Sequence, residues 1–172
     1  MTGSGFPPDP ELDVVTSAFI AAGASFVVIG GFAVIAHRYV RATEDVDLMI
    51  PEDATNDQLC IAALHSLDAR AYPSRDPLAE DALKGRHHLR ALTSAGLVDL
   101  LREGESPLDF GTVASAALAA DLGAGEFRIA GLHTVVALKQ IADRPRDRND
   151  LAELERIHGK LPAALPDLDA ET

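Results

Sequence analysis

The stretch at residues 26–50, FVVIGGFAVIAHRYVRATEDVDLMI, constrains the fold more than any other part of the chain. It begins with residues 26–29, which are β-branched or aromatic and end at a glycine, a pattern that predicts a buried strand. Gly30 and Gly31 follow, and the residues after them have the spacing of a short helix. With a second strand predicted over 46–50, the stretch predicts a strand, a glycine turn, a helix and another strand in succession.

Two aspartates, Asp45 and Asp47, lie two residues apart at the start of the second predicted strand. On a strand, residues i and i+2 point to the same face, with Cα atoms roughly 6.5 Å apart. The two carboxylates should therefore project together, while Val46, Leu48 and Ile50 point into the core. Adjacent carboxylates repel unless a cation lies between them, and their hard oxygen ligands suit Mg²⁺. The pair predicts a metal site; the alternative is a solvated strand end.

A third acid, Asp99, lies within the apolar segment LVDLL. A carboxylate in so hydrophobic a strand is costly to bury without a partner. By alternation, Asp99 shares a face with Leu97 and Leu101. If this strand pairs beside that of Asp45 and Asp47, three acids converge on one point, enough for two metal ions. The alternative is an edge-strand aspartate that faces water.

Turn signals and apolar periodicity divide the rest of the chain into short elements. The predicted helices cover 11–22, 58–67, 113–122, 132–142 and 145–158. The predicted strands are a hairpin of 87–92 with 97–101, and a short strand at 127–130. Residues 70–85 are predicted to form a long loop. We therefore expect one α/β (α+β) domain over 1–172, with flexible segments at 1–10 and 162–172.

Length, charge and cysteine content limit the classes of protein to be considered. The chain has 172 residues, and no apolar run approaches the roughly 20 residues of a membrane span. No secretory signal is evident, so a cytoplasmic location with no membrane partner is expected. Cys60 is the only cysteine, which excludes an internal disulfide and favours a core role. The formal net charge of −12 disfavours tight binding to nucleic acid without excluding a local basic patch.

Basic residues lie near the acids in sequence and on the later helices. Arg41 and Thr43 precede the acidic pair and are expected to shape its loop. The alternating basic residues Lys84, Arg86, His88 and Arg90 would form one row on a strand. Such a row could hold a triphosphate or a nucleic-acid acceptor, and the alternative is a solvated strand face.

Two charged residues lie on the apolar faces of the last two predicted helices. Lys139 falls among Leu132, Val135 and Val136, so it should reach a triphosphate or an acid, unless its stem simply follows the helix surface. Asp147 lies on the face of Leu151 and Leu154. It could anchor a neighbouring arginine or complement the helix N-terminus.

Together these motifs resemble the nucleotidyltransferase superfamily that includes DNA polymerase beta. The resemblance rests on Gly30-Gly31, Arg41-x-Thr43-x-Asp45-x-Asp47-Leu48 and Asp99. It is closer to the AbiEii-type abortive-infection toxins and related small bacterial nucleotidyltransferases. The C-terminal stretch LHTVVALKQIADRPRDRNDLAEL is similar to the helix-turn-helix signature of that group, with Lys139, Arg144, Asp147 and Asp150 at the matching positions. The likeness covers residues 25–155.

The resemblance implies a mixed β-sheet flanked by helices, with a C-terminal helical portion. It implies that Asp45 and Asp47 hold two Mg²⁺ ions, with Mn²⁺ as an alternative. Asp99 would complete the shell of one metal and orient or deprotonate an attacking hydroxyl. Gly30 and Gly31 would cradle the β- and γ-phosphates of an NTP. Lys139 and Arg144 are the remaining residues expected to bind the nucleotide.

The sequence departs from a common pattern of the superfamily, in which a serine follows the first glycine and lends a hydroxyl. Gly31 offers only its backbone N–H at that position. Versions with two glycines are nevertheless familiar in several branches of the superfamily.

The leading hypothesis is a Mg²⁺-dependent nucleotidyltransferase that moves an NMP from an NTP to an acceptor hydroxyl and releases pyrophosphate. The acceptor is open between the 3′ end of a tRNA, as the toxin likeness suggests, a protein side chain and a small molecule. A toxin would have a cognate antitoxin as a partner. An aminoglycoside-type nucleotidyltransferase is the enzymatic alternative. A relative that binds a nucleotide or a protein without chemistry is the non-enzymatic one.

Overall fold

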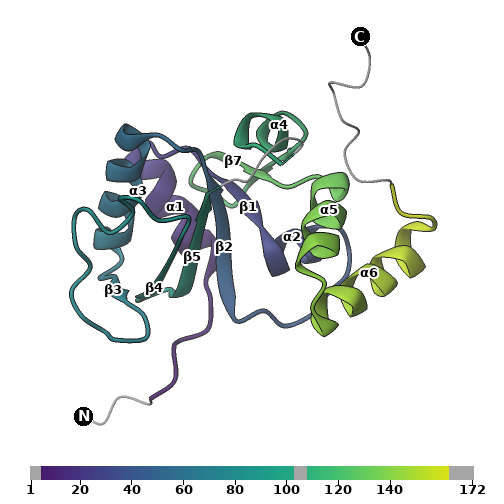
Figure 1. The fold of residues 1–172 in the computed structure, drawn as a ribbon, viewed down its shortest axis with the longest axis horizontal. Helices are drawn as coiled ribbons and strands as arrows, with labels where there is room; N and C mark the ends of the chain where they lie inside the picture. Colours follow the sequence, from purple (N-terminus) through teal and green to yellow (C-terminus); the bar gives the residue numbers. More distant parts are fainter. Residues whose placement is uncertain (1–4, 103–107, 163–172) are drawn as a thin grey trace.

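A mixed β-sheet is the centre of the computed structural model, which describes residues 5–102 and 108–162 (Figure 1). Its seven strands lie in the order β3-β4-β5-β2-β1-β7-β6. The strands are β1 (Val27–Ile29), β2 (Asp45–Ile50), β3 (Arg70–Ala71), β4 (His88–Thr93), β5 (Gly96–Arg102), β6 (Leu118–Asp121) and β7 (Glu126–Ile129). The helices are α1 (Leu12–Ala22), α2 (Gly30–Ala36), α3 (Ala54–Ser66), α4 (Phe110–Ser115), α5 (Leu132–Ala142) and α6 (Pro145–His158). Residues 1–4 and 163–172, within the two ends expected to be flexible, lie outside the described residues.

The sheet combines parallel and antiparallel pairs, and its register decides where the acids lie. β2 runs parallel to β5, so that Asp47 is directly opposite Asp99. β4 pairs antiparallel with β5 and places Arg90 opposite Asp99. On the other side of β2, the antiparallel strand β1 places Ile29 opposite Asp47. The strand of Asp99 thus lies beside that of Asp45 and Asp47, which is the condition under which the three acids were expected to converge.

The two faces of the sheet have different environments. Val46, Leu48 and Ile50 have no solvent exposure, as alternation along β2 predicts for its core face. Helices α1 and α3 pack against each other on one side of the strands, and α5 and α6 lie together on the other side (Figure 1). Cys60 of α3 is fully buried, and burial raises the pKa of its thiol to about 12, which confirms the predicted core role.

Most predicted elements recur near their predicted bounds. Helices α5 and α6 have the expected limits, and α1 ends at Gly23, whose left-handed backbone conformation favours glycine. Helix α3 begins earlier than expected, because the Asp53 carboxylate accepts a hydrogen bond from the Asn56 N–H and caps it. The predicted loop at 70–85 contains the short strand β3.

The predicted alanine-rich helix over 113–122 is wrong. Helix α4 is already closed by residue 116, and the chain then forms β6. β6 pairs antiparallel with β7 and extends the sheet by one strand. The helix propensity of alanine is worth less than about 1 kcal/mol per residue, so tertiary pairing can override it.

Truncation of a central-strand leucine should be costly. Leu48 has no exposed surface, so Leu48→Ala should lower the free energy of unfolding by about 2–5 kcal/mol through lost burial and a residual cavity. Leu118→Ala is the matched control, because Leu118 is also a strand leucine but is 51% exposed. Its effect should stay within about 0.5 kcal/mol. Urea denaturation measures both, and equal losses would contradict the assigned faces.

Candidate functional site

A cavity of about 480 Å³ contains the residues that the sequence singled out. Its lining includes Gly30, Gly31, Asp45, Asp47, Asp99, Lys139 and Arg144. These residues come from α2, β2, β5, α5 and the start of α6, so the fold brings together segments far apart in sequence.

Three carboxylates form one wall of this cavity. Asp45, Asp47 and Asp99 each offer a carboxylate oxygen, and the three oxygens lie within 4.8 Å of one another. Asp99 is only 5% exposed, and β5 is an inner strand, which rules out the edge-strand alternative. The predicted convergence of the three acids is confirmed.

Burial and mutual repulsion make these acids unusual. Burial, followed by the charges of Asp45 and Asp99, raises the pKa of Asp47 to about 7. Burial also raises the pKa of Asp99, against the opposing effects of His88 and Arg90. Carboxylates that are hard to ionise together are stabilised by a nearby positive charge.

Two basic side chains of β4 supply positive charge or hydrogen bonds at the acids. The Nη2 atom of Arg90 lies 2.6 Å from Oδ2 of Asp45 and 3.1 Å from Oδ2 of Asp99. The Nε2 atom of His88 lies 2.6 Å from Oδ1 of Asp99. Neither contact follows from the amino-acid sequence alone, because both depend on the register between β4 and β5.

The basic row predicted over residues 84–90 is wrong as a continuous row. β4 begins at His88, so Lys84 and Arg86 precede the strand. They line a separate cavity of about 460 Å³ instead. Only His88 and Arg90 of the four therefore reach the acids.

The glycine turn fits closely against the neighbouring side chains. Gly30 has a φ of +66°, and a Cβ there would lie 2.0 Å from Oδ2 of Asp47. A Cβ at Gly31 would lie 2.4 Å from Oγ1 of Thr43. Both positions therefore require glycine, for a left-handed conformation and for close approach. The Thr43 hydroxyl occupies the space into which a larger residue at position 31 would extend.

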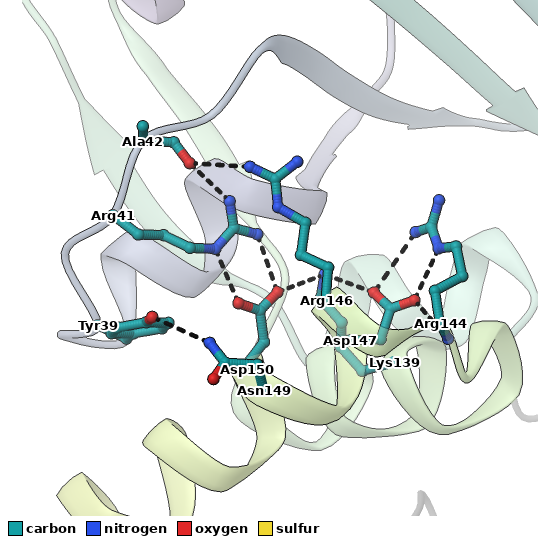
Figure 2. A network of polar contacts seen from close by, with 9 residues as sticks. All are labelled: Tyr39, Arg41, Ala42, Lys139, Arg144, Arg146, Asp147, Asn149 and Asp150. Carbon is teal, nitrogen blue, oxygen red and sulfur yellow. Dashed lines mark hydrogen bonds and ion pairs between the residues drawn. The ribbon is translucent and has the colours of Figure 1, made fainter.

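A buried network of ion pairs joins the loop after α2 to the last two helices (Figure 2). Lys139 Nζ lies 2.9 Å from Asp147 Oδ1 and 2.8 Å from Asp150 Oδ2. Arg41 binds both oxygens of Asp150, through Nε at 2.8 Å and Nη2 at 2.9 Å. Lys139 thus reaches acids, one of the two alternatives predicted for it, and Arg41 holds its loop as expected.

Asp147 fulfils both roles considered for it. Its Oδ2 accepts hydrogen bonds from the backbone N–H and from Nε of Arg144, at 3.1 Å and 2.7 Å, at the start of α6 (Figure 2). Burial would raise the pKa of Asp147, but the hydrogen bonds from Arg144 and Lys139 outweigh it and lower the pKa to about 2.

Asp150 matches the C-terminal signature in sequence, but its role as the partner of two basic residues was not predicted. It has no solvent exposure and holds both Arg41 and Lys139. The helical spacing could have indicated this role. Asp150 follows Asp147 by three residues and precedes the apolar Leu154 by four, so the three share one helix face. A charged residue on an apolar face needs a partner.

The comparisons with known proteins identify the fold. No protein-family model and no curated protein matches the sequence. The lincosamide antibiotic adenylyltransferase LnuA, bound to lincomycin, matches with a TM-score of 0.61 at 12% identity, over 87% of this chain and 99% of that one. ANT(2'')-Ia in complex with adenylyl-2''-tobramycin matches with a TM-score of 0.54 at 15% identity, over 83% and 82%. The chain has the nucleotidyltransferase fold.

A third solved structure has the same fold. An antigenic nucleotidyltransferase-like protein from Paracoccidioides brasiliensis matches with a TM-score of 0.52 at 15% identity, over 92% of this chain and 81% of that one. The predicted mixed sheet with flanking helices is thereby confirmed. Within the described residues, no helix is long and apolar enough to cross a membrane.

Substitution of Gly31 should reveal its contact with Thr43. We expect Gly31→Ala to lower the free energy of unfolding by about 1–3 kcal/mol, because the new Cβ would overlap Oγ1 of Thr43. Thr43→Ala in the same chain should recover part of this loss. Urea denaturation of the four proteins of this double-mutant cycle measures the coupling. Simple additivity would contradict the assigned contact.

The low pKa of Asp147 predicts a dependence of stability on pH. Because its pKa falls from 3.8 to about 2 on folding, the ionised group stabilises the fold above pH 4, and this stabilisation disappears as the pH falls to 2. The unfolding free energy of wild type should exceed that of Asp147→Asn at pH 6, with up to about 2 kcal/mol of the difference lost by pH 2.

The control for this measurement is Asp143→Asn. Asp143 also pairs with an arginine, Arg148, but both side chains are exposed. Exposed pairs contribute little to stability, so this variant should follow wild type closely. Denaturant unfolding at a series of pH values compares the three proteins. A gap between wild type and Asp147→Asn that does not change with pH would refute the linkage.

Proposed function

We propose that this chain is a Mg²⁺-dependent nucleotidyltransferase that moves an NMP from an NTP to an acceptor hydroxyl. The observation that carries the proposal is the convergence of Asp45, Asp47 and Asp99 within 4.8 Å in a cavity also lined by the Gly30-Gly31 turn. The nucleotidyltransferase fold supports it. In the reaction the acceptor oxygen bonds to the α-phosphorus, the bond from that phosphorus to the β-bridging oxygen breaks, and pyrophosphate leaves.

The acidic triad fits a divalent metal. Its donors are hard carboxylate oxygens from three side chains, and burial and repulsion leave them in need of positive charge. We assign Asp45 and Asp47 to two Mg²⁺ or Mn²⁺ ions and Asp99 to one of them. Bound Mg²⁺ would stabilise charge on the phosphates and favour ionisation of the acceptor hydroxyl.

The protein's own groups would bind and orient the two substrates. The backbone N–H groups of Gly30 and Gly31 would donate to the β- and γ-phosphates. The Thr43 hydroxyl, close to Gly31, would supply the hydroxyl that a serine lends in other members. Asp99 would accept the acceptor's proton on a carboxylate oxygen.

Two basic residues from α5 and α6 would complete the nucleotide site. The Arg144 side chain is 72% exposed at the cavity, and it can turn toward a phosphate while keeping its charge. Lys139 is held by Asp147 and Asp150, which leaves one of its three N–H groups for a phosphate oxygen. Its role would be a fixed positive charge beside the triphosphate.

The acceptor that follows from the AbiEii-type likeness is the 3′ end of a tRNA, with a cognate antitoxin as partner. The structural neighbours favour a second candidate, a small-molecule acceptor. LnuA is described with lincomycin and ANT(2'')-Ia with adenylyl-2''-tobramycin. The net charge of −12 also favours an acceptor without a phosphate backbone. Incubation with each labelled NTP and separate pools of tRNA, lincosamides and aminoglycosides distinguishes the candidates.

Asp47→Asn should separate the chemistry from folding. Removal of one carboxylate should reduce Mn²⁺ binding and lower NMP transfer by about two orders of magnitude or more. Calorimetric Mn²⁺ titration and labelled-NTP turnover measure the two effects. Metal-free stability at pH 8 should not fall, because burial and repulsion already disfavour this charge.

Glu44→Gln is the control for this substitution. Glu44 is exposed next to the acidic pair, so its loss removes the same charge without touching the triad. The Mn²⁺ affinity of the Glu44→Gln variant should remain close to that of wild type. Transfer activity that survives in Asp47→Asn would overturn the two-metal assignment. Failure of wild type to bind Mn²⁺ and to turn over any NTP would favour the non-catalytic alternative.

A further inference from the structure

The guanidinium of Arg90 lies where positive charge at the acidic triad is needed. Its Nη2 atom is 2.6 Å from Oδ2 of Asp45 and 3.1 Å from Oδ2 of Asp99, so one guanidinium nitrogen contacts two of the three acids. The sheet fixes this arrangement, because Arg90 is opposite Asp99, and Asp99 is opposite Asp47. One arginine and two acids thus form a continuous row across three strands.

The two carboxylates that Arg90 contacts belong to the three that would hold a metal. Asp45, Asp47 and Asp99 present their oxygens within 4.8 Å of one another. A divalent ion among these oxygens would compete with Arg90 for their lone pairs. It would also carry the same sign of charge as the guanidinium at a short distance, which is unfavourable. Arg90 and a bound metal therefore cannot both bind the acids as Arg90 does here.

The other groups around Arg90 favour a side chain that can move. Its Nε is buried and has no hydrogen-bond partner among the described residues, so this position does not satisfy all of its donors. The side chain is 36% exposed, so it is not enclosed. Its guanidinium carbon already lies over the Tyr72 ring, 5.9 Å from the ring centre, and this contact does not depend on the acids.

We infer that Arg90 is a built-in counter-ion of the acidic triad, which a divalent metal must displace. This inference rests on the proposed function. In the metal-free protein the guanidinium offsets the repulsion among the three carboxylates. When the metal binds, the guanidinium leaves the acids and turns into the cavity that Arg90 lines, with the Tyr72 ring beside it. The metal affinity of the site is then set by competition with this one arginine.

Arg90→Gln tests the competition directly. Removal of the competing charge should lower the Kd for Mn²⁺, measured calorimetrically without nucleotide, at least about fivefold. Arg90→Lys keeps a positive charge and should stay within about twofold of wild type. Arg128→Gln is the charge-matched control, because Arg128 lies on β7 and donates to the carbonyl oxygen of Ala114. Its Kd should match that of wild type.

A structural role for Arg90 would give the opposite result. If Arg90 only holds the acids in place, Arg90→Gln should bind Mn²⁺ more weakly or with unchanged affinity, and either outcome overturns the inference. The proposed function does not depend on this result, provided that wild type binds Mn²⁺. If wild type itself binds no Mn²⁺, both proposals fail.

A second measurement uses only the wild-type protein, so it does not depend on whether a variant folds. Wild type is treated with phenylglyoxal, which modifies arginine, and peptide mass spectrometry follows each site. Saturating Mn²⁺ should increase the modification rate of Arg90, while the rate of Arg128 stays constant. An unchanged or slower rate at Arg90 would show that metal does not release it, and would overturn the displacement.

Discussion

The repulsion among three carboxylates on one face of the sheet is the constraint on which the rest of the site depends. The parallel register of β2 and β5 brings Asp47 and Asp99 side by side, and Asp45 joins them from two residues away. Three negative charges at this distance are stable only with positive charge nearby. Arg90 supplies positive charge to Asp45 and Asp99 from β4. The order and register of the strands therefore determine both where the acids meet and which positive charge offsets them.

The C-terminal helices are tied to this face by buried charge as well as by apolar packing. Asp150 binds Arg41, which lies 109 positions earlier in the chain, and it also binds Lys139 (Figure 2). Buried ion pairs contribute little net stability because desolvation offsets their attraction, but loss of one partner is costly. The network thus favours one particular placement of α5 and α6 against the loop, and this placement completes the cavity.

Much of the site could be predicted because its signals are local. Alternation along β2 indicates which face Asp45 and Asp47 share, and the apolar neighbours of Asp99 indicate an inner strand. The contacts of Arg90 and Asp150 are not local, since they depend on strand register and on the packing of α6 against a distant loop. The helix predicted over 113–122 failed for a related reason: strand pairing with β7 outweighs the weak preference of alanine.

The close fit of the glycine turn against the acids has a thermodynamic consequence. Because a Cβ at Gly30 would overlap the Asp47 carboxylate, the backbone of the turn and this side chain share one small volume. A ligand that shifts either group must change the free energy of the other. If a ligand binds at the turn and another at the carboxylate, as proposed, each alters the binding of the other by the same factor. The proposed phosphate and metal sites would then act as a single cooperative unit.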